Sequence, residues 1–246
     1  MRRAGAAATF SVMARIARVV VPGCPHHVTQ RGNHHRDVFF CDADRQLYLQ
    51  LLRENCRKYG LRVLAWCQMT NHVHLVAVPE REESLAQGLG RAHNDYARWM
   101  HVRQGQVGHL WQNRFHSCVL DEAHLWEAMR YVESNPVRAG LAGQAWEWAW
   151  SSARAHAAGT DGEGLLDLTL WRERYDGRFW QLVLQEGYRQ AALQERLRQA
   201  TRTGRPFGGE DFVRELEERL NRRLRPAKPG PRAQGAANGQ TSFEVT

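Results

Sequence analysis

The amino-acid sequence predicts an α+β fold, an antiparallel sheet with helices packed on one face, followed by a helical C-terminal extension. Between about residues 16 and 158, strand-like and helix-like patterns follow the order strand, helix, strand, strand, helix, strand, helix. Two of the strands are joined only by the short turn Met69-Thr70-Asn71, so they must run antiparallel. This order excludes a doubly wound parallel sheet.

The first elements of this pattern lie in residues 16–59. Residues 16–32 alternate and are rich in valine, which predicts two extended pieces with Pro22-Gly23 between them. Residues 42–59 predict a helix, because leucines recur on one face and Gly60 follows at a position where helices favour glycine.

The middle of the chain supplies the remaining strands and a second helix. Residues 62–68 and 72–78 predict a hairpin of two apolar strands. Residues 84–103 predict a helix, and residues 109–120, rich in Trp, Phe and Val, predict an extended segment.

The third helix begins after the capping residue Asp121 and must end near Asn135, because Pro136 disfavours helix in the residue before it. Beyond residue 160 the sequence becomes rich in Arg and Glu, with helical patterns over residues 178–200 and 209–224. The organisation therefore predicts four parts: a disordered N-terminus at 1–15, a core domain at 16–158, a helical extension at 159–224 and a disordered basic tail at 225–246.

The composition favours a polyanionic partner without requiring one. Among 246 residues, 34 Lys and Arg against 26 Asp and Glu give a net charge of +8. Such an excess suits nucleic acid, although a generically basic protein would have the same balance.

Cysteine usage and hydropathy point to the cytoplasm. The five cysteines occur singly, with no C-x-x-C pair, which predicts reduced thiols and argues against a disulfide framework or a cysteine zinc site. The apolar run at 4–14 is interrupted by Thr9 and Ser11 and followed by Arg15, so we expect neither secretion nor a membrane partner.

The strongest chemical pattern is Asn71-His72-Val73-His74. Residues two apart on a strand project to the same face, so His72 and His74 present two imidazoles side by side while Val73 faces the opposite side. Neutral imidazoles in this arrangement can bind a divalent ion. Two histidines with purely structural roles would produce the same pattern.

A second pattern lies on the helix that ends before Pro136. Tyr131 and Asn135 are four residues apart and share a helix face. If this helix packs across the strand of His72 and His74, Asn135 can supply a third, oxygen ligand and Tyr131 stands beside the ion. A core tyrosine and a helix-terminal asparagine are the alternative.

Four segments in this order and spacing carry a family resemblance: residues 21–33, 69–75, 108–115 and 131–141. In that order, they resemble four features of one family: its opening strands, its His-hydrophobic-His (HUH) motif, the strand before its nucleophile helix, and the nucleophile helix with the loop that follows. That family is the REP-associated tyrosine transposase branch of the single-tyrosine HUH (IS200-like) transposases. The resemblance spans about residues 16–158 and implies a ferredoxin-like core.

The resemblance implies a role for four residues. His72 and His74 would be metal ligands, Tyr131 the nucleophile and Asn135 the third ligand. Asn135 is a departure from the wider family, which usually has glutamine there. The ion implied is Mg²⁺ or Mn²⁺, and the reaction is cleavage of single-stranded DNA, in hairpin-bearing sequences, through a 5′-phosphotyrosine intermediate. The protein would act in the cytoplasm on the nucleoid, as a monomer or a homodimer.

Other residues are weaker candidates. Tyr96 is a rival nucleophile, although its helix has an apolar face that favours a packing role. Single-strand binders combine basic residues with aromatic stacking, and on this basis we assign candidate DNA contacts to Arg31, Arg98, Trp111, Arg114, Arg138, Arg222 and Arg223. A solvated surface role, or core packing, is an equal alternative for each of them. Residues 209–228, together with the preceding helix, resemble a helix-turn-helix-like DNA-binding appendage found in some members of the branch.

Three other functions are compatible with parts of this pattern. A catalytically silent DNA- or RNA-binding regulator would keep the fold and the basic tail, but has no need of all four site residues. A rolling-circle replication initiator or relaxase shares HUH chemistry, but this chain has no helicase-like P-loop. A zinc hydrolase is disfavoured because there is no H-E-x-x-H motif.

Overall fold

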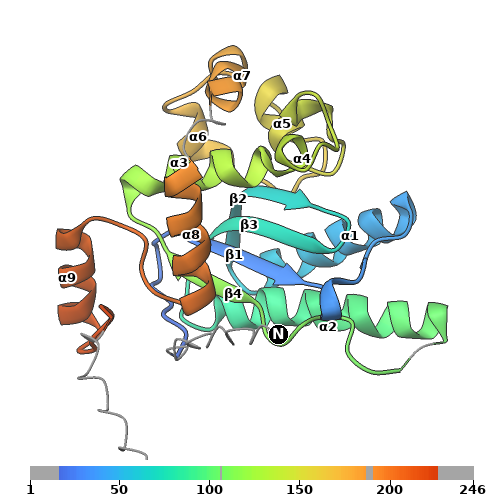
Figure 1. The fold of residues 1–246 in the computed structure, drawn as a ribbon, viewed down its shortest axis with the longest axis horizontal. Helices are drawn as coiled ribbons and strands as arrows, with labels where there is room; N and C mark the ends of the chain where they lie inside the picture. Colours follow the sequence, from blue (N-terminus) through green and yellow to red (C-terminus); the bar gives the residue numbers. More distant parts are fainter. Residues whose placement is uncertain (1–16, 106, 187–190, 227–246) are drawn as a thin grey trace, which may run out of the picture.

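The computed structural model describes residues 17–105, 107–186 and 191–226. At its centre is a four-stranded antiparallel sheet in the order β2-β3-β1-β4 (Figure 1). The strands are β1 (His26–Arg31), β2 (Leu61–Gln68), β3 (His72–Pro79) and β4 (His116–Val119). The prediction of an α+β fold with an antiparallel sheet is confirmed.

Helices cover both faces of the sheet, which corrects the prediction of one covered face. One face packs against α1 (Asp42–Lys58) and α2 (Ser84–Gln104), and the other against α3 (Glu122–Glu133). Shorter helices complete the second side: α4 (Asn135–Arg138), η2 (Ala145–Glu147), α5 (Ala153–Ala158), α6 (Thr169–Arg172) and α7 (Gly177–Glu186).

Both faces of the sheet are covered because its central strands are apolar on both sides. Val73, Leu75 and Ala77 of β3 pack toward α1 and α2, whereas Val76 and Val78 pack toward α3. A strand apolar at nearly every position is buried on both faces. The same is true of β2, in which seven of the eight residues are buried.

Two element boundaries differ from the prediction. Within the predicted extended segment 109–120, only His116–Val119 is strand, and Asn113 has a φ of 59°, in the left-handed region. The third helix ends at Glu133, and Pro136 then lies in the first turn of α4, where its missing N–H costs nothing.

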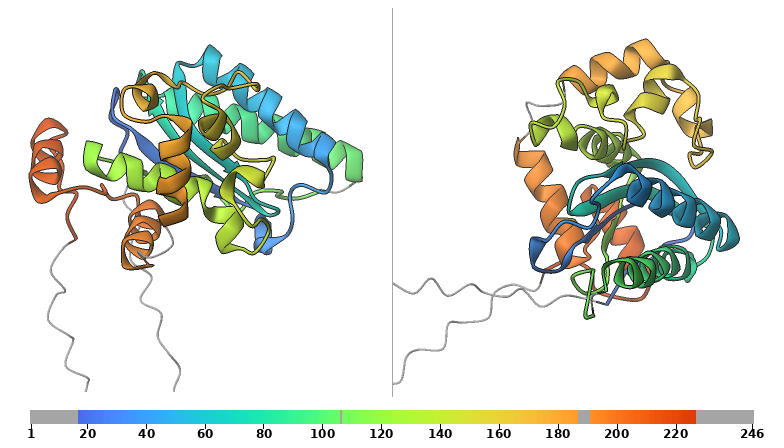
Figure 2. Two further views of the ribbon diagram at one scale, coloured as in Figure 1. Left: turned by 90° about the horizontal axis from the view of Figure 1, so that it is seen from above. Right: turned by 90° about the vertical axis from the view of Figure 1, so that its right-hand side faces the viewer.

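The C-terminal extension packs against the central sheet at separate places: Leu166 pairs with Val63 of β2, and two helices pack elsewhere (Figure 2). Helix α8 (Ala191–Thr203) lies over β4 and β1, and the apolar face of α9 (Glu210–Arg219) packs against Val19, Val21 and Val119. The predicted segment 178–200 thus contains α7 and α8, and residues 187–190 between them lie outside the described residues. The predictions for residues 1–15 and 227–246 also lie outside them.

Within the described ranges, no helix has the length and apolar character needed to cross a membrane. All five cysteines are free thiols, as predicted.

Candidate active site

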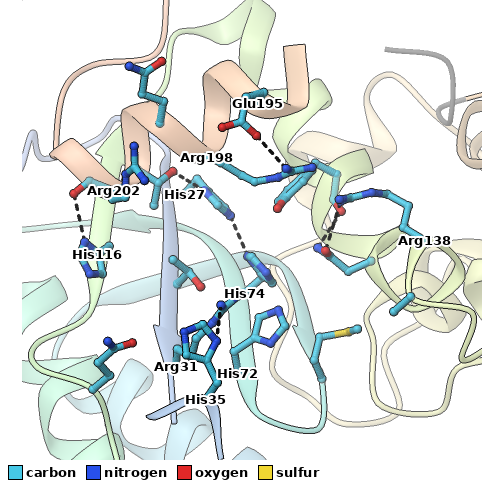
Figure 3. Close-up of a pocket in the computed structure, with 18 residues that line it drawn as sticks. His27, Arg31, His35, His72, His74, His116, Arg138, Glu195, Arg198 and Arg202 are labelled. Atoms are coloured by element: carbon cyan, nitrogen blue, oxygen red, sulfur yellow. Dashed lines mark hydrogen bonds and ion pairs between the residues drawn. The ribbon is translucent and has the colours of Figure 1, made fainter. Parts of the chain in front are cut away.

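A cavity of about 730 Å³ opens where β1, β3, α3 and α8 meet (Figure 3). Its lining contains all four residues singled out from the sequence: His72, His74, Tyr131 and Asn135. In this structure a single chain brings all four together.

His72 and His74 lie on the same face of β3, and Val73 is buried in the opposite core, as the strand alternation predicts. The two imidazole rings lie 4.9 Å apart between centroids and nearly at right angles, at 77°. Burial is the main cause that lowers the pKa of His72 to about 4, and Arg31 contributes. Burial also lowers the pKa of His74 well below its ordinary value, and His72 adds to this effect. Both rings are therefore neutral at physiological pH and can act as ligands without first losing a proton.

Tyr131 stands beside these rings because α3 crosses this face of the sheet. Its ring centroid lies 5.5 Å from that of His74 and 5.6 Å from that of His27, in both cases edge to face. The residue is 6% exposed, at the wall of the cavity. The sequence analysis required this helix to pack across the strand of His72 and His74, and it does so in the structure.

The side-chain amide of Asn135 has a fixed orientation. Its Nδ2 donates to the carbonyl oxygens of Tyr131 at 2.9 Å and Val132 at 3.3 Å, one turn back along the helix. Its Oδ1 accepts only a long hydrogen bond, 3.3 Å, from Arg138. Since both amide donors are used on the backbone, the oxygen is the end available for another partner.

These donors fit a hard divalent ion. Two neutral imidazoles and an amide oxygen form a mixed nitrogen and oxygen donor set that can bind a divalent transition-metal ion, and Mn²⁺ is one such ion. Among the described residues, no three His, Cys, Asp or Glu side chains are arranged to hold a metal ion, and Asn135 offers an amide oxygen in the same cavity.

Two of the candidate DNA contacts lie in this cavity. Arg31 lines it and forms a 3.1 Å hydrogen bond with His35, and the guanidinium carbon of Arg138 lies 4.9 Å from the Tyr131 ring centroid. Four others do not line the cavity: Arg98, Arg114, Arg222 and Arg223. Their contact with DNA stays a prediction.

Trp111 was predicted to stack on a base, and the structure contradicts this. It is 7% exposed, its indole nitrogen donates to the carbonyl oxygen of His93 at 2.9 Å, and its ring packs with Tyr48 and Tyr96. The aromatic run around Trp111 packs into the core beneath α2, so its ring is largely covered by protein.

Tyr96 belongs to the same core and is not a second nucleophile candidate. It is fully buried on the opposite side of the sheet from Tyr131, and its hydroxyl donates to the carbonyl oxygen of Val38 at 2.6 Å. Burial raises its pKa above the ordinary value. The packing role favoured by its apolar helix face is the one observed.

Sequence reasoning missed the contribution of α8 to the cavity. Glu195, Arg198, Gln199, Thr201 and Arg202 all line it, and the guanidinium carbon of Arg198 lies 6.0 Å from the Tyr131 ring centroid. His27 of β1 was also missed, although it lies on the same face of the sheet as His74. The spacing of His27, Thr29 and Arg31 signals one face of a strand, but no local signal connects α8 to that face.

Comparison with known proteins agrees with this geometry. Residues 20–135 match the family model described as an IS200-like transposase. No curated protein matches the chain. The fold is similar to the solved structure of a REP-associated tyrosine transposase bound to a REP hairpin, with 18% identity and a TM-score of 0.51, covering 63% of this chain and 92% of that one. A putative transposase from Deinococcus radiodurans, also 18% identical, covers 49% of this chain and 96% of its own length, with a TM-score of 0.35.

Proposed function

We propose, from the match of residues 20–135 to the IS200-like transposase family model, that the chain cleaves and rejoins single-stranded DNA through a covalent bond to Tyr131. The main support for the proposal is that Tyr131, His72 and His74 line one cavity. The ring centroids of Tyr131 and His74 lie 5.5 Å apart. A phenol next to paired imidazoles suits nucleophilic attack at phosphorus.

In the proposed reaction, the phenolic oxygen of Tyr131 attacks the scissile phosphorus. A bond forms between this oxygen and the 5′-phosphate, the bond from phosphorus to the 3′-oxygen breaks, and the departing 3′-oxygen takes up a proton. The phosphotyrosine ester conserves the energy of the broken bond, so a 3′-hydroxyl can later attack it and rejoin the strand without ATP.

Arginines around Tyr131 would stabilise the charge that builds up on the phosphate. Arg138 and Arg198 lie on different helices, and their guanidinium carbons are 4.9 and 6.0 Å from the tyrosine ring centroid. Guanidinium groups bind phosphate oxygens in a bidentate manner, which would also orient the strand for in-line attack.

His72, His74 and Asn135 would hold a divalent ion, Mg²⁺ or Mn²⁺. When bound, such an ion polarises a non-bridging phosphate oxygen and offsets the developing negative charge. Arg138 donates a long hydrogen bond to the amide oxygen of Asn135, so this arginine lies next to the proposed ligand and could also contact the phosphate.

The substrate we propose is single-stranded DNA with a hairpin. The net charge of +8 and the arginines of the cavity support a polyanionic partner. The hairpin preference follows from the family resemblance, and the similar transposase was solved with a REP hairpin bound. The protein would act on the nucleoid, in the cytoplasm.

The experiment is covalent capture on labelled single-stranded oligonucleotides that carry a hairpin and flanking sequence from the DNA around the gene. We expect a labelled protein band that survives a denaturing gel, requires Mg²⁺ or Mn²⁺, and is absent from His74→Ala protein. Tight binding without an adduct on any strand would contradict the proposal and favour a silent DNA-binding regulator.

A further inference from the structure

A buried hydrogen-bond relay connects the C-terminal extension to His74. His74 Nδ1 lies 3.1 Å from His27 Nε2, and His27 Nδ1 lies 2.7 Å from the hydroxyl oxygen of Thr201 on α8 (Figure 3). The Thr201 hydroxyl in turn lies 2.8 Å from the carbonyl oxygen of Leu197. His27 and Thr201 are both 1% exposed, so water does not compete for these bonds.

The direction of this relay is fixed at its far end. A carbonyl oxygen can only accept, so the single proton of the Thr201 hydroxyl is used on Leu197. The hydroxyl oxygen must then accept from His27, which makes Nδ1 the protonated nitrogen of that ring. His27 Nε2 is consequently an acceptor, and His74 donates to it from Nδ1. Cys118 Sγ, 3.2 Å from the same hydroxyl, is consistent with this direction, because burial raises its pKa to about 12 and keeps the thiol a donor.

A second, shorter relay acts on His72. Asn71 Nδ2 donates to the carbonyl oxygen of His35 at 2.9 Å, which identifies Oδ1 as the amide atom that faces the neighbouring imidazole. That oxygen lies 2.6 Å from His72 Nδ1, which must donate to it. Both relays therefore end on a backbone carbonyl and leave the same nitrogen, Nε2, without a proton.

We propose that His27 with Thr201, and Asn71, are positioning residues that hold both motif histidines as Nδ1–H tautomers and present both Nε2 lone pairs to the metal. This inference rests on the proposed function, which assigns His72 and His74 as the ligands. A neutral imidazole coordinates through its unprotonated nitrogen, and the hydrogen bond of the other nitrogen determines which one that is. Among the described residues, neither His72 Nε2 nor His74 Nε2 has a hydrogen-bond partner.

The relay gives α8 a role in the metal site that no local pattern in the sequence indicates. Thr201 lies 174 residues from His27 in the chain, and it can hold this tautomer only when α8 is docked over β1 and β4. Correct docking of the extension would therefore be a condition for tight metal binding.

The first test is histidine ¹⁵N NMR on the metal-free full-length protein. Protonated and unprotonated ring nitrogens have distinct shifts, and the signals of His27, His72 and His74 are assigned by single substitution. We expect the Nδ1–H form for all three. An Nε2–H tautomer at His74 or His72 in the wild-type protein would overturn the proposal, whether or not the protein binds metal.

The second test measures Mn²⁺ affinity by calorimetry. We expect Thr201→Val to weaken Mn²⁺ binding about 10- to 100-fold, the range usual for loss of a residue that orients a metal ligand. Thr201→Ser keeps the hydroxyl and should restore wild-type affinity. Cys118→Ala removes the other neighbour of that hydroxyl and serves as the matched control. Asn71→Ala tests the second relay without disturbing the core, because Asn71 is only half-buried.

The outcomes separate this inference from the proposed function. Thr201→Val protein that is folded and binds Mn²⁺ as tightly as the wild type would overturn the relay while leaving the metal site intact. Wild-type protein that binds no Mn²⁺, or that binds it equally well after His72→Ala and His74→Ala, would overturn the ligand assignment itself, and the NMR tautomers would still decide the direction of the relay.

Discussion

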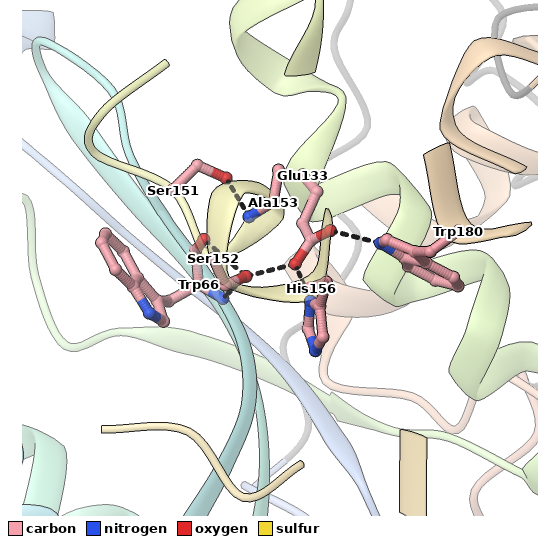
Figure 4. A network of polar contacts seen from close by, with 7 residues as sticks. All are labelled: Trp66, Glu133, Ser151, Ser152, Ala153, His156 and Trp180. Atoms are coloured by element: carbon pink, nitrogen blue, oxygen red, sulfur yellow. Dashed lines mark hydrogen bonds and ion pairs between the residues drawn. The ribbon is translucent and has the colours of Figure 1, made fainter. Parts of the chain in front are cut away.

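Two buried polar clusters lie on opposite sides of α3, and they differ in what they leave unpaired. The site cluster contains His27, His72 and His74 and faces the cavity beside Tyr131. The anchor cluster is centred on Glu133, only two residues after Tyr131 (Figure 4). Residues two apart on a helix point in different directions, so one helix takes part in both clusters.

The carboxylate at the centre of the anchor cluster is fully satisfied, although His156 Nε2 is buried without a hydrogen-bond partner among the described residues. Glu133 is fully buried, and its carboxylate accepts from Ser152, from His156 Nδ1 at 2.5 Å and from Trp180 Nε1 at 2.7 Å. These donors lie on the loop before α5, on α5 and on α7, so the carboxylate ties three parts of the chain to the nucleophile helix. A buried carboxylate with its hydrogen bonds satisfied contributes to a specific structure and offers nothing to a ligand.

The site cluster is open by comparison. Its hydrogen bonds fix the Nδ1 side of each motif histidine and leave both Nε2 atoms without a partner among the described residues. Of the two clusters, only the site cluster lines the cavity beside Tyr131, so we expect it to serve chemistry and the anchor cluster to stabilise the fold. Substitutions on the two sides should therefore separate stability from activity.

The largest effect is expected from loss of the motif histidines. His72→Ala and His74→Ala should each remove detectable cleavage and Mn²⁺ binding. His74→Ala also leaves His27 Nε2 without its donor, which should cost about 1–3 kcal/mol of unfolding free energy, less than the loss of the Glu133 carboxylate. Oligonucleotide cleavage, calorimetry and thermal unfolding measure the three quantities. A His74→Ala protein that cleaves at a tenth of the wild-type rate or faster would remove the distinction between the clusters.

The opposite pattern is expected for Glu133. Glu133→Ala leaves several buried donors without a partner and should cost about 3–5 kcal/mol of unfolding free energy, which corresponds to a melting temperature roughly 10 °C lower for a chain of this size. Glu133→Gln keeps the shape and one acceptor and should cost about 1–3 kcal/mol. Both variants should still cleave DNA at a temperature where they are folded. Loss of cleavage by well-folded Glu133→Gln would show that the anchor cluster takes part in the chemistry.

Acid should destabilise the protein through its buried neutral histidines. Burial lowers the pKa of His26 to about 4, and those of His27 and His93 to about 3. Below pH 6.5 the histidines of the unfolded chain take up protons, whereas the buried histidines of the folded protein stay neutral. The free energy of unfolding is therefore highest above pH 6.5 and decreases as the pH falls toward 4. Each histidine should contribute a slope of about 1.4 kcal/mol per pH unit.

Urea unfolding at pH 7, 6 and 5 checks this expectation. His93→Phe removes one of the three protonations at a position outside the site cluster, so its stability should fall less steeply with acid. A slope equal to that of the wild type would mean that His93 does not titrate in the unfolding reaction.

The smallest effect on DNA binding is expected from substitution of Arg198, a residue of α8 that lines the cavity. If it contacts a phosphate, Arg198→Ala should weaken single-strand binding and lower the slope of log affinity against log salt by about 0.7. Arg214 is the matched control, because it also forms an ion pair three residues back on an exposed helix but lies outside the cavity. Fluorescence anisotropy across a salt series measures both. Equal slopes for the two variants would exclude Arg198 from the phosphate contacts.

The residues of the candidate site that local periodicity governs could be predicted. Strand alternation put His72 and His74 on one face, and helix periodicity put Tyr131 and Asn135 together. Each pair is determined by backbone geometry over at most five residues.

What could not be predicted depends on contacts between distant segments. Thr201 meets His27 only because α8 docks across the sheet, and no pattern within either segment encodes that docking. The prediction for Trp111 failed for a related reason, since an indole that stacks on a base and one that fills a core look the same in sequence. The second covered face of the sheet had a signal, the almost uninterrupted apolar run of β2 and β3, which a purely alternating strand would lack.

The most direct measurement of the central claim is to locate the DNA on the protein. Wild-type adduct is digested with nuclease and trypsin, and the peptide that keeps a nucleotide is identified by mass spectrometry. The account predicts the nucleotide on the peptide that ends at Arg138, in which Tyr131 is the only tyrosine. Modification of the peptide that ends at Arg98, which contains only Tyr96, or a Tyr131→Phe protein that still forms the adduct, would contradict it.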